Sequence, residues 1–171
     1  MSLQFTLKAE AINNSFFKSI EPLDKEIPMS MRLTPAQKEM ISQSGGYSVL
    51  CHDYKKKVIG AACVVPYENS IGFRFPFKHE LPTRGKCAYI FFMKIVEAHN
   101  KKGSNIRETI WRVILGKAKA EDYKTVAAHI QILSDKCIGD FIPKIPIHTE
   151  IIRGFWPETP NPDVKLVVVK T

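Results

Sequence analysis

The chain has 171 residues, of which 44% are hydrophobic and 25% are charged, and its formal net charge is +8. This composition is typical of a globular protein with its own core, and it excludes collagen-like, low-complexity and fully disordered chains. The longest apolar run is too short to span a membrane and no signal peptide is visible, so we expect a cytoplasmic protein folded as a single domain, residues 1–171.

The first 46 residues predict one strand and two helices. Residues 4–8 alternate polar and apolar side chains, which indicates a strand. Residues 12–20 carry apolar side chains at helical spacing, and Pro22 is expected to end that helix. The pair Thr34-Pro35 predicts a capped start for a second helix, and Gly45-Gly46 predicts its end.

The middle of the chain reads mainly as strands. Residues 47–52 and 58–65 predict an antiparallel hairpin, in which Gly60 permits a close approach of another element. Residues 66–86 are rich in proline, glycine and phenylalanine and indicate a loop or a β-excursion. Residues 87–97 predict a long central strand.

The last third of the chain adds one long helix and three strands. The helix spans residues 104–121, with an apolar stripe formed by Ile106, Ile110, Val113, Ile114 and Ala118. Strands are predicted at 123–132, 150–156 and 164–169, and a short helix within 134–144. One strand–helix–strand unit inside otherwise antiparallel strands predicts an α/β (α+β) fold, a mixed and mostly antiparallel sheet with helices on both faces.

Cysteine and charge patterns narrow the classes of function. Cys51, Cys63, Cys87 and Cys137 form no CxxC pair and no cluster with zinc spacing, so we expect buried free thiols and no metal. The positive charge favours an anionic partner such as nucleic acid, an acidic protein or a phosphorylated ligand. It is spread along the chain without a nucleic-acid-binding motif, and a solvated basic surface explains it equally well.

The segment between the central strand and the long helix is the most informative part of the sequence. It reads Asn100-Lys101-Lys102-Gly103-Ser104-Asn105. Free N–H groups and the partial positive charge of a helix N-terminus suit a phosphate, and the two lysines add charge beside it. The alternative interpretation is a plain capping turn with Ser104 as the N-cap.

This order of elements, together with that segment, resembles the GCN5-related N-acetyltransferase superfamily. In that family a Q/R-x-x-G-x-G/A loop after the fourth strand holds the pyrophosphate of acetyl-CoA. Here Asn100 stands in place of Gln or Arg, and Asn105 in place of the final Gly or Ala. Residues 58–62 also resemble the third strand of the family, and Arg153-Gly154-Phe155 resembles the Gly-Phe that precedes its last strand.

The resemblance implies an enzyme that transfers an acetyl group from acetyl-CoA, its co-substrate, to an amine of unknown identity. It implies that the backbone of Ile95 and Val96 pairs with the pantetheine arm at a bulge where the fourth and fifth strands part, with Glu97 beside it. It further implies that the following loop holds the pyrophosphate through Asn100, Lys101, Lys102, Gly103, Ser104 and Asn105.

The catalytic groups that the family uses are replaced in this chain. Tyr89 stands where a glutamate base occurs, and Glu150 where a tyrosine acid occurs. Glu97, His99 and His129 remain as acid–base candidates, and Tyr89 is a further candidate for catalysis or acceptor binding. A CoA-binding protein without catalysis, and a basic domain that binds protein or nucleic acid, are the alternatives. Either a monomer or a homodimer fits the sequence.

Overall fold

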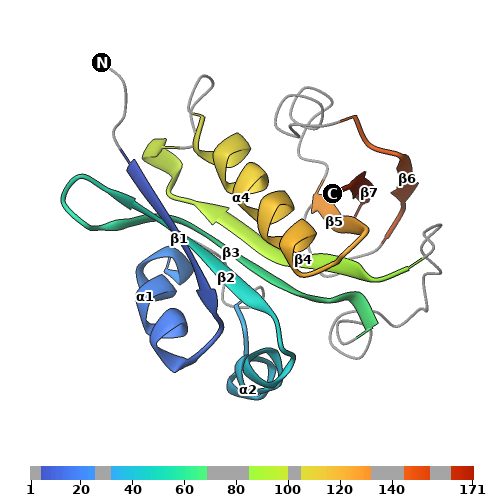
Figure 1. The fold of residues 1–171 in the computed structure, drawn as a ribbon. Helices are drawn as coiled ribbons and strands as arrows, with labels where there is room; N and C mark the ends of the chain where they lie inside the picture. Colours follow the sequence, from blue (N-terminus) through green and yellow to red (C-terminus); the bar gives the residue numbers. More distant parts are fainter. Residues whose placement is uncertain (1–4, 26–31, 69–84, 100–104, 132–144, 155–162) are drawn as a thin grey trace.

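A seven-stranded sheet forms the centre of the protein in the computed structural model (Figure 1). The strand order is β1-β2-β3-β4-β5-β7-β6, and every neighbouring pair is antiparallel except β4 and β5, which are parallel. This confirms the predicted mixed, mostly antiparallel sheet. The strands are β1 (Phe5–Ala11), β2 (Tyr47–Asp53), β3 (Val58–Pro66), β4 (Cys87–Ile95), β5 (Thr125–Gln131), β6 (His148–Ile152) and β7 (Val164–Lys170).

The structure describes residues 5–25, 32–68, 85–99, 105–131, 145–154 and 163–171. Several predictions lie outside these ranges: the excursion over 69–84, the loop residues 100–104, the short helix within 134–144, and Phe155. Among the described residues, no helix combines the length and the apolar character needed to cross a membrane.

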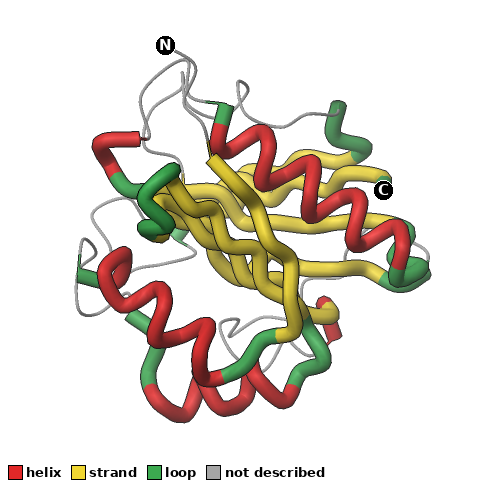
Figure 2. Tube along the Cα trace, turned by 60° about the vertical axis from the view of Figure 1, so that its left-hand side comes forward, coloured by secondary structure: helices red, strands yellow, loops and turns green. Residues whose placement is uncertain are grey.

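Helices cover the two faces of the sheet unequally (Figures 1 and 2). Helices α1 (Asn14–Asp24) and α2 (Pro35–Gln43) lie on one face, and the longer α4 (Ile106–Ala120) lies on the other. A short 3₁₀ helix, η2 (Glu97–His99), follows β4. We call the two sides of the sheet the α1/α2 face and the α4 face.

The α4 face is a dense apolar layer. The predicted stripe is buried at Ile106, Ile110, Ile114 and Ala118, whereas Val113 is half-buried. Trp111 and Leu115 are buried as well, because the contact strip is wider than the predicted stripe. On this same face, the Tyr47 hydroxyl of β2 donates a hydrogen bond of 2.9 Å to the Ile114 carbonyl oxygen of α4.

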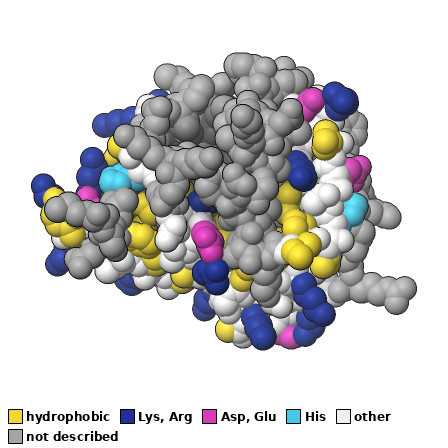
Figure 3. Space-filling view, turned by 90° about the horizontal axis from the view of Figure 1, so that it is seen from above, with side chains coloured by type: hydrophobic (Ala, Val, Ile, Leu, Met, Phe, Trp, Pro, Cys, Tyr) yellow, Lys and Arg dark blue, Asp and Glu magenta, His cyan; other side chains and the backbone are white. Residues whose placement is uncertain are grey.

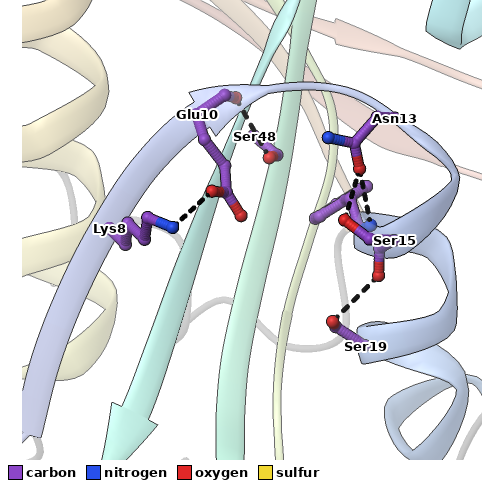
Figure 4. A network of polar contacts seen from close by, with 7 residues as sticks. Lys8, Glu10, Asn13, Ser15, Ser19 and Ser48 are labelled. Atoms are coloured by element: carbon purple, nitrogen blue, oxygen red, sulfur yellow. Dashed lines mark hydrogen bonds and ion pairs between the residues drawn. The ribbon is translucent and has the colours of Figure 1, made fainter.

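On the α1/α2 face, α1 begins at a capped N-terminus and continues past its proline. The Asn13 side chain accepts a hydrogen bond from the Phe16 N–H at 3.1 Å (Figure 4). Pro22 was predicted to end the helix, and this is wrong: α1 continues to Asp24. Pro22 lies in the last turn with its ring exposed, while burial of Leu23 and Asp24 holds the end of the helix on the sheet.

Helix α2 confirms its predicted signals. The Thr34 side chain accepts a hydrogen bond from the Gln37 N–H, and the Gln37 side chain accepts one from the Thr34 N–H, which makes a complete capping box. Beyond the helix, Gly45 has a φ of +73°, a conformation that favours glycine. The chain then turns directly into β2.

Several strand boundaries differ from their predictions. β1 continues to Ala11, although the predicted strand ends at residue 8. The strand predicted over 87–97 ends at Ile95, since the chain turns into η2. The strand predicted from 123 begins at Thr125, and the strand predicted over 150–156 occupies 148–152. Apolar residues at these ends extend the strand pattern into turns, which periodicity alone does not separate.

Candidate functional site

The two parallel strands part in the middle of the sheet. β4 pairs with β5 only from Cys87 to Ile90, opposite Thr125 to Ala128. Beyond this point β4 continues beside β3 as far as Ile95, while the rest of β5 continues beside β7. Within the described residues, the last half of β4 therefore has an open edge toward β5.

The bulge that accompanies this parting lies earlier than predicted. The register between β3 and β4 shifts because Cys63 pairs with Phe92 and Val64 with Ile90, which leaves Phe91 as the extra residue. The position predicted for the bulge, Ile95 and Val96, is thus wrong, because the extra residue lies four positions before Ile95. The apolar run of β4 carries no signal for a bulge at Phe91.

Backbone hydrogen bonds show which residues of β4 face the open edge. The Val96 N–H donates to the Ile59 oxygen at 2.9 Å, and the Val96 oxygen accepts from the His99 N–H at 2.8 Å. Since successive residues of a strand direct their backbone groups to opposite sides, Met93 and Ile95 face the opening. Of the two residues predicted to bind pantetheine, Ile95 faces the open edge, whereas the backbone N–H and oxygen of Val96 already have partners.

Two predicted catalytic residues meet where the strands part. The Tyr89 hydroxyl and His129 Nδ1 are 2.9 Å apart, joining β4 to β5 on the α1/α2 face. Tyr89 is only 1% exposed, with its ring edge-to-face against Tyr67 and Phe91. Burial raises the pKa of the neighbouring Tyr67. A phenol and an imidazole at hydrogen-bonding distance can pass a proton between them, which is the chemistry that general acid–base catalysis needs.

The same half of β4 carries a buried ion pair that the sequence did not suggest. Lys94 Nζ lies 2.5 Å from the carboxylate of Asp24 at the end of α1, and the two side chains are 17% and 10% exposed. Lys94 Nζ also lies 5.2 Å from the ring centroid of Phe92, which stacks on Phe16. Seventy residues separate the two charges, so no local pattern indicates the pair.

In the sequence, α4 is the next α-helix after the open half of β4. Asn105 occupies the N-cap position without a side-chain hydrogen bond to the helix, and its φ is −79°, so it does not use a left-handed conformation. Glu108 is the acidic residue in the first turn of α4, and Arg112 donates two hydrogen bonds to it. The charge of Arg112 therefore balances the negative charge of Glu108 near the N-terminus of the helix. The roles predicted for residues 100–104 lie outside the described residues and stay predictions.

The other predicted residues, Glu97, His99 and Glu150, lie on different elements from Tyr89 and His129. Glu97 opens η2, and its side chain is outside the described part of the chain; His99 closes η2 and is half-buried. Glu150 lies on β6 and is exposed.

Two of the described cysteines, Cys51 and Cys87, are not activated nucleophiles. Cys51, Cys63 and Cys87 are buried free thiols, as predicted, and Cys137 lies outside the described residues. Burial raises the pKa of Cys51 and of Cys87 to about 11. Because the thiolate is the reactive form, these two groups are nearly inert at neutral pH.

Basic side chains are scattered over the described residues of the face shown in Figure 3. In Figure 3 the visible Lys and Arg side chains lie around the face and not in one patch, and acidic side chains lie among them. Several are paired with acids, including Lys8 with Glu10 at 2.7 Å and Lys117 with Glu121 at 2.9 Å. On the described residues of this face, the charge forms no continuous track of the kind that binds nucleic acid.

Comparison with known proteins shows the class of fold. No protein-family model matches the sequence, and no curated protein matches it closely. Among solved structures, Arabidopsis thaliana NAA60 in complex with acetyl-CoA superposes with a TM-score of 0.67 at 16% identity, covering 97% of this chain and 100% of that one. A putative phosphinothricin N-acetyltransferase gives 0.68 at 14% identity, covering 96% and 98%.

A third structure agrees with these two. The ribosomal-protein-S18-alanine N-acetyltransferase of Escherichia coli superposes with a TM-score of 0.63 at 8% identity, covering 96% of this chain and 94% of that one. The chain therefore has the acyl-CoA N-acyltransferase fold of the GCN5-related superfamily, and the predicted resemblance is confirmed at the level of the fold.

Proposed function

We propose that this protein is an acetyl-CoA-dependent N-acetyltransferase that acts on an amine. The observation that carries the proposal is the parting of β4 from β5 after Ile90, with the Tyr89–His129 pair at the point of parting. The fold neighbours, which include an acetyl-CoA complex, support the same class of activity.

The open edge of β4 suits the pantetheine arm of acetyl-CoA. That arm carries two amides, and the backbone groups of Met93 and Ile95 face the opening, where they can bond to it as a strand would. The next segment along the chain leads into the N-terminus of α4, whose first N–H groups favour a phosphate. We assign the pyrophosphate to this end, with Asn100, Lys101, Lys102, Gly103, Ser104 and Asn105 as its contacts.

We assign proton transfer to the Tyr89–His129 pair. The amine nitrogen attacks the thioester carbon, the C–S bond breaks, and one proton must move from the amine to the sulfur. In our proposal His129 takes the amine proton at Nε2 and passes its Nδ1 proton to the Tyr89 oxygen, as Tyr89 gives its own proton to the sulfur. The relay is neutral overall, so neither group needs to be ionised in the resting enzyme.

The test combines binding with turnover. Acetyl-CoA at a hundred times its Kd should stabilise the folded protein by about 2.7 kcal/mol, seen as a rise in Tm. A release assay for the CoA thiol over a panel of amines and N-terminal peptides should find an acceptor. With that acceptor, Tyr89→Phe and His129→Gln should each lower kcat by about 100-fold or more, with a smaller change in the Kd for acetyl-CoA.

Tyr47→Phe is the matched control. It removes a buried tyrosine hydroxyl that bonds to the Ile114 oxygen on the opposite face of the sheet, so it should lower stability but leave kcat unchanged. Binding of acetyl-CoA without turnover on any amine would favour the CoA-binding protein without catalysis. No shift in Tm at saturating acetyl-CoA would reject the proposal and favour the interaction domain.

A further inference from the structure

Exposed apolar side chains gather on one edge of the sheet. Among the described residues, five large apolar side chains are exposed: Met40, Tyr54, Ile145, Ile147 and Ile151. Three of these five lie on β6 or just before it, and Ile145 is 91% exposed. Figure 1 shows β6 at the outer edge of the sheet, beyond β7. Such an edge is a template for another strand.

Among the described residues, the opposite edge of the sheet, β1, exposes no large apolar side chain. On β1 the outward-lying residues are charged or small, and Lys8 forms an ion pair of 2.7 Å with Glu10 (Figure 4). Charged side chains, lysine above all, discourage strand addition at an edge. β6 carries a comparable pair, His148 Nε2 with Glu150 at 3.6 Å, but beside it β6 exposes isoleucines, which would be unfavourable in water unless they were covered.

Among the described residues, no strand pairs with the outer side of β6. The Thr171 N–H donates to the Lys124 oxygen, so the odd-numbered residues of β7 face β5 and the even-numbered ones face β6. The partners of these even-numbered residues on β6 are His148, Glu150 and Ile152. Thr149 and Ile151 therefore direct their N–H and carbonyl groups outward.

The sequence of this edge is complementary to itself. Residues 147–151 read Ile-His-Thr-Glu-Ile. In an antiparallel pair centred on Thr149, Ile147 of one copy lies opposite Ile151 of the other, and His148 opposite Glu150. The odd-numbered side chains share one face and the polar pair lies on the other, so apolar meets apolar and a basic group meets an acidic one.

We propose that β6 pairs antiparallel with β6 of a second copy of this chain, about a two-fold axis at Thr149. The two Thr149 residues exchange backbone hydrogen bonds, and each Ile151 N–H donates to the Ile147 oxygen of the second copy. The two seven-stranded sheets become one sheet of fourteen strands. The proposal is independent of the acetyltransferase activity.

The first test measures the mass of the protein by sedimentation equilibrium over a wide range of concentration. The wild-type protein should dimerise. Thr149→Pro, which removes an outward N–H, and Ile151→Lys should each raise the dimer dissociation constant at least tenfold. Met40→Lys is the control, because it makes the same kind of change at an exposed apolar side chain on α2 and should leave the dimer intact.

Further variants test the register and do not depend on weakening the fold. Thr149→Cys should form a disulfide-linked dimer on mild oxidation, because the two Cα atoms would lie about 5.5 Å apart, within the range for a disulfide. Ile151→Cys should not, since the two copies of that residue lie far apart along the strands. Glu150→Lys should weaken the dimer, and adding His148→Glu should restore it.

A wild-type protein that stays monomeric at all concentrations would overturn the proposal. So would a dimer that Thr149→Pro and Ile151→Lys leave unchanged, or cross-linking through Ile151→Cys in place of Thr149→Cys. Because the readout is mass and not turnover, these outcomes stand apart from any failure of the acetyltransferase assay.

Discussion

The two faces of the sheet bury different kinds of side chain. The α4 face is a continuous apolar layer, and its buried side-chain hydrogen bond runs from Tyr47 to a helix carbonyl. The α1/α2 face is apolar too, but it encloses a phenol–imidazole pair and an ion pair of Lys94 with Asp24. Burying polar groups costs free energy, because they lose their contacts with water. We therefore regard the α4 face as the main source of stability and assign the chemistry to the α1/α2 face.

The largest expected effect comes from breaking the ion pair on the α1/α2 face. Lys94→Met leaves the Asp24 carboxylate buried without its lysine, and we expect a loss of about 3–5 kcal/mol in the free energy of unfolding. Urea denaturation measures this loss. Adding Asp24→Leu should recover much of it, and a loss below 1 kcal/mol in the single variant would mean that the pair is effectively solvated.

On the α4 face, the next largest effect is expected from removing buried side-chain volume. Ile114 is fully buried, so Ile114→Ala should cost about 3 kcal/mol through lost burial and the cavity left behind. Val113→Ala, at a half-buried neighbouring position, is the matched control and should cost clearly less. Equal losses would show that the packing of α4 is not the source of stability on this face.

A smaller effect is expected at the start of α2. Thr34→Ala removes the side chain that accepts the Gln37 N–H in the capping box, and about 1 kcal/mol of stability should be lost. Gln43→Ala, at an exposed position of the same helix, should change the midpoint of urea unfolding little. Thermal and urea unfolding together distinguish this loss from a change in cooperativity.

The fourth effect is absent at neutral pH and grows only in alkali. The folded protein holds the pKa of Cys51 and Cys87 at about 11, whereas the ordinary value is 9.0. Above pH 9 the unfolded chain therefore releases protons that the folded chain keeps, and stability falls as the pH rises toward 11. Cys51→Ala, on the α4 face, and Cys87→Ala, on the α1/α2 face, should each make Tm fall less steeply with pH above pH 9. A slope unchanged in both variants would contradict the assignment.

The sequence predicted the parts of the fold that depend on local spacing. The apolar stripe of α4 and the Thr34 cap follow from residues three or four apart, and both are confirmed. The mixed, mostly antiparallel sheet followed from the strand–helix–strand unit inside otherwise antiparallel strands. The end of α1 was mispredicted, because tertiary burial of Leu23 and Asp24 outweighs the local effect of Pro22.

The candidate site was predicted as residues but not as an arrangement. Tyr89 and His129 were both named, yet forty residues separate them and only the parallel register brings them to 2.9 Å. The same holds for Lys94 and Asp24, which no periodic pattern connects. The point where β4 and β5 part was predicted five residues too late, because hydrogen-bond register is a property of two strands and is not written in either one alone.

The extra residue in β4 determines what the second half of that strand can present. Phe91 and Phe92 both lie in the core of the α1/α2 face, so inside and outside exchange at this point, and Lys94 comes to face α1 while Met93 and Ile95 lie against the opposite core. If the same sequence kept strict alternation, without an extra residue at Phe91, this half of the strand would be inverted. Lys94 would then be carried into the apolar layer beneath α4. The bulge therefore keeps the charge of Lys94 on the face where Asp24 lies.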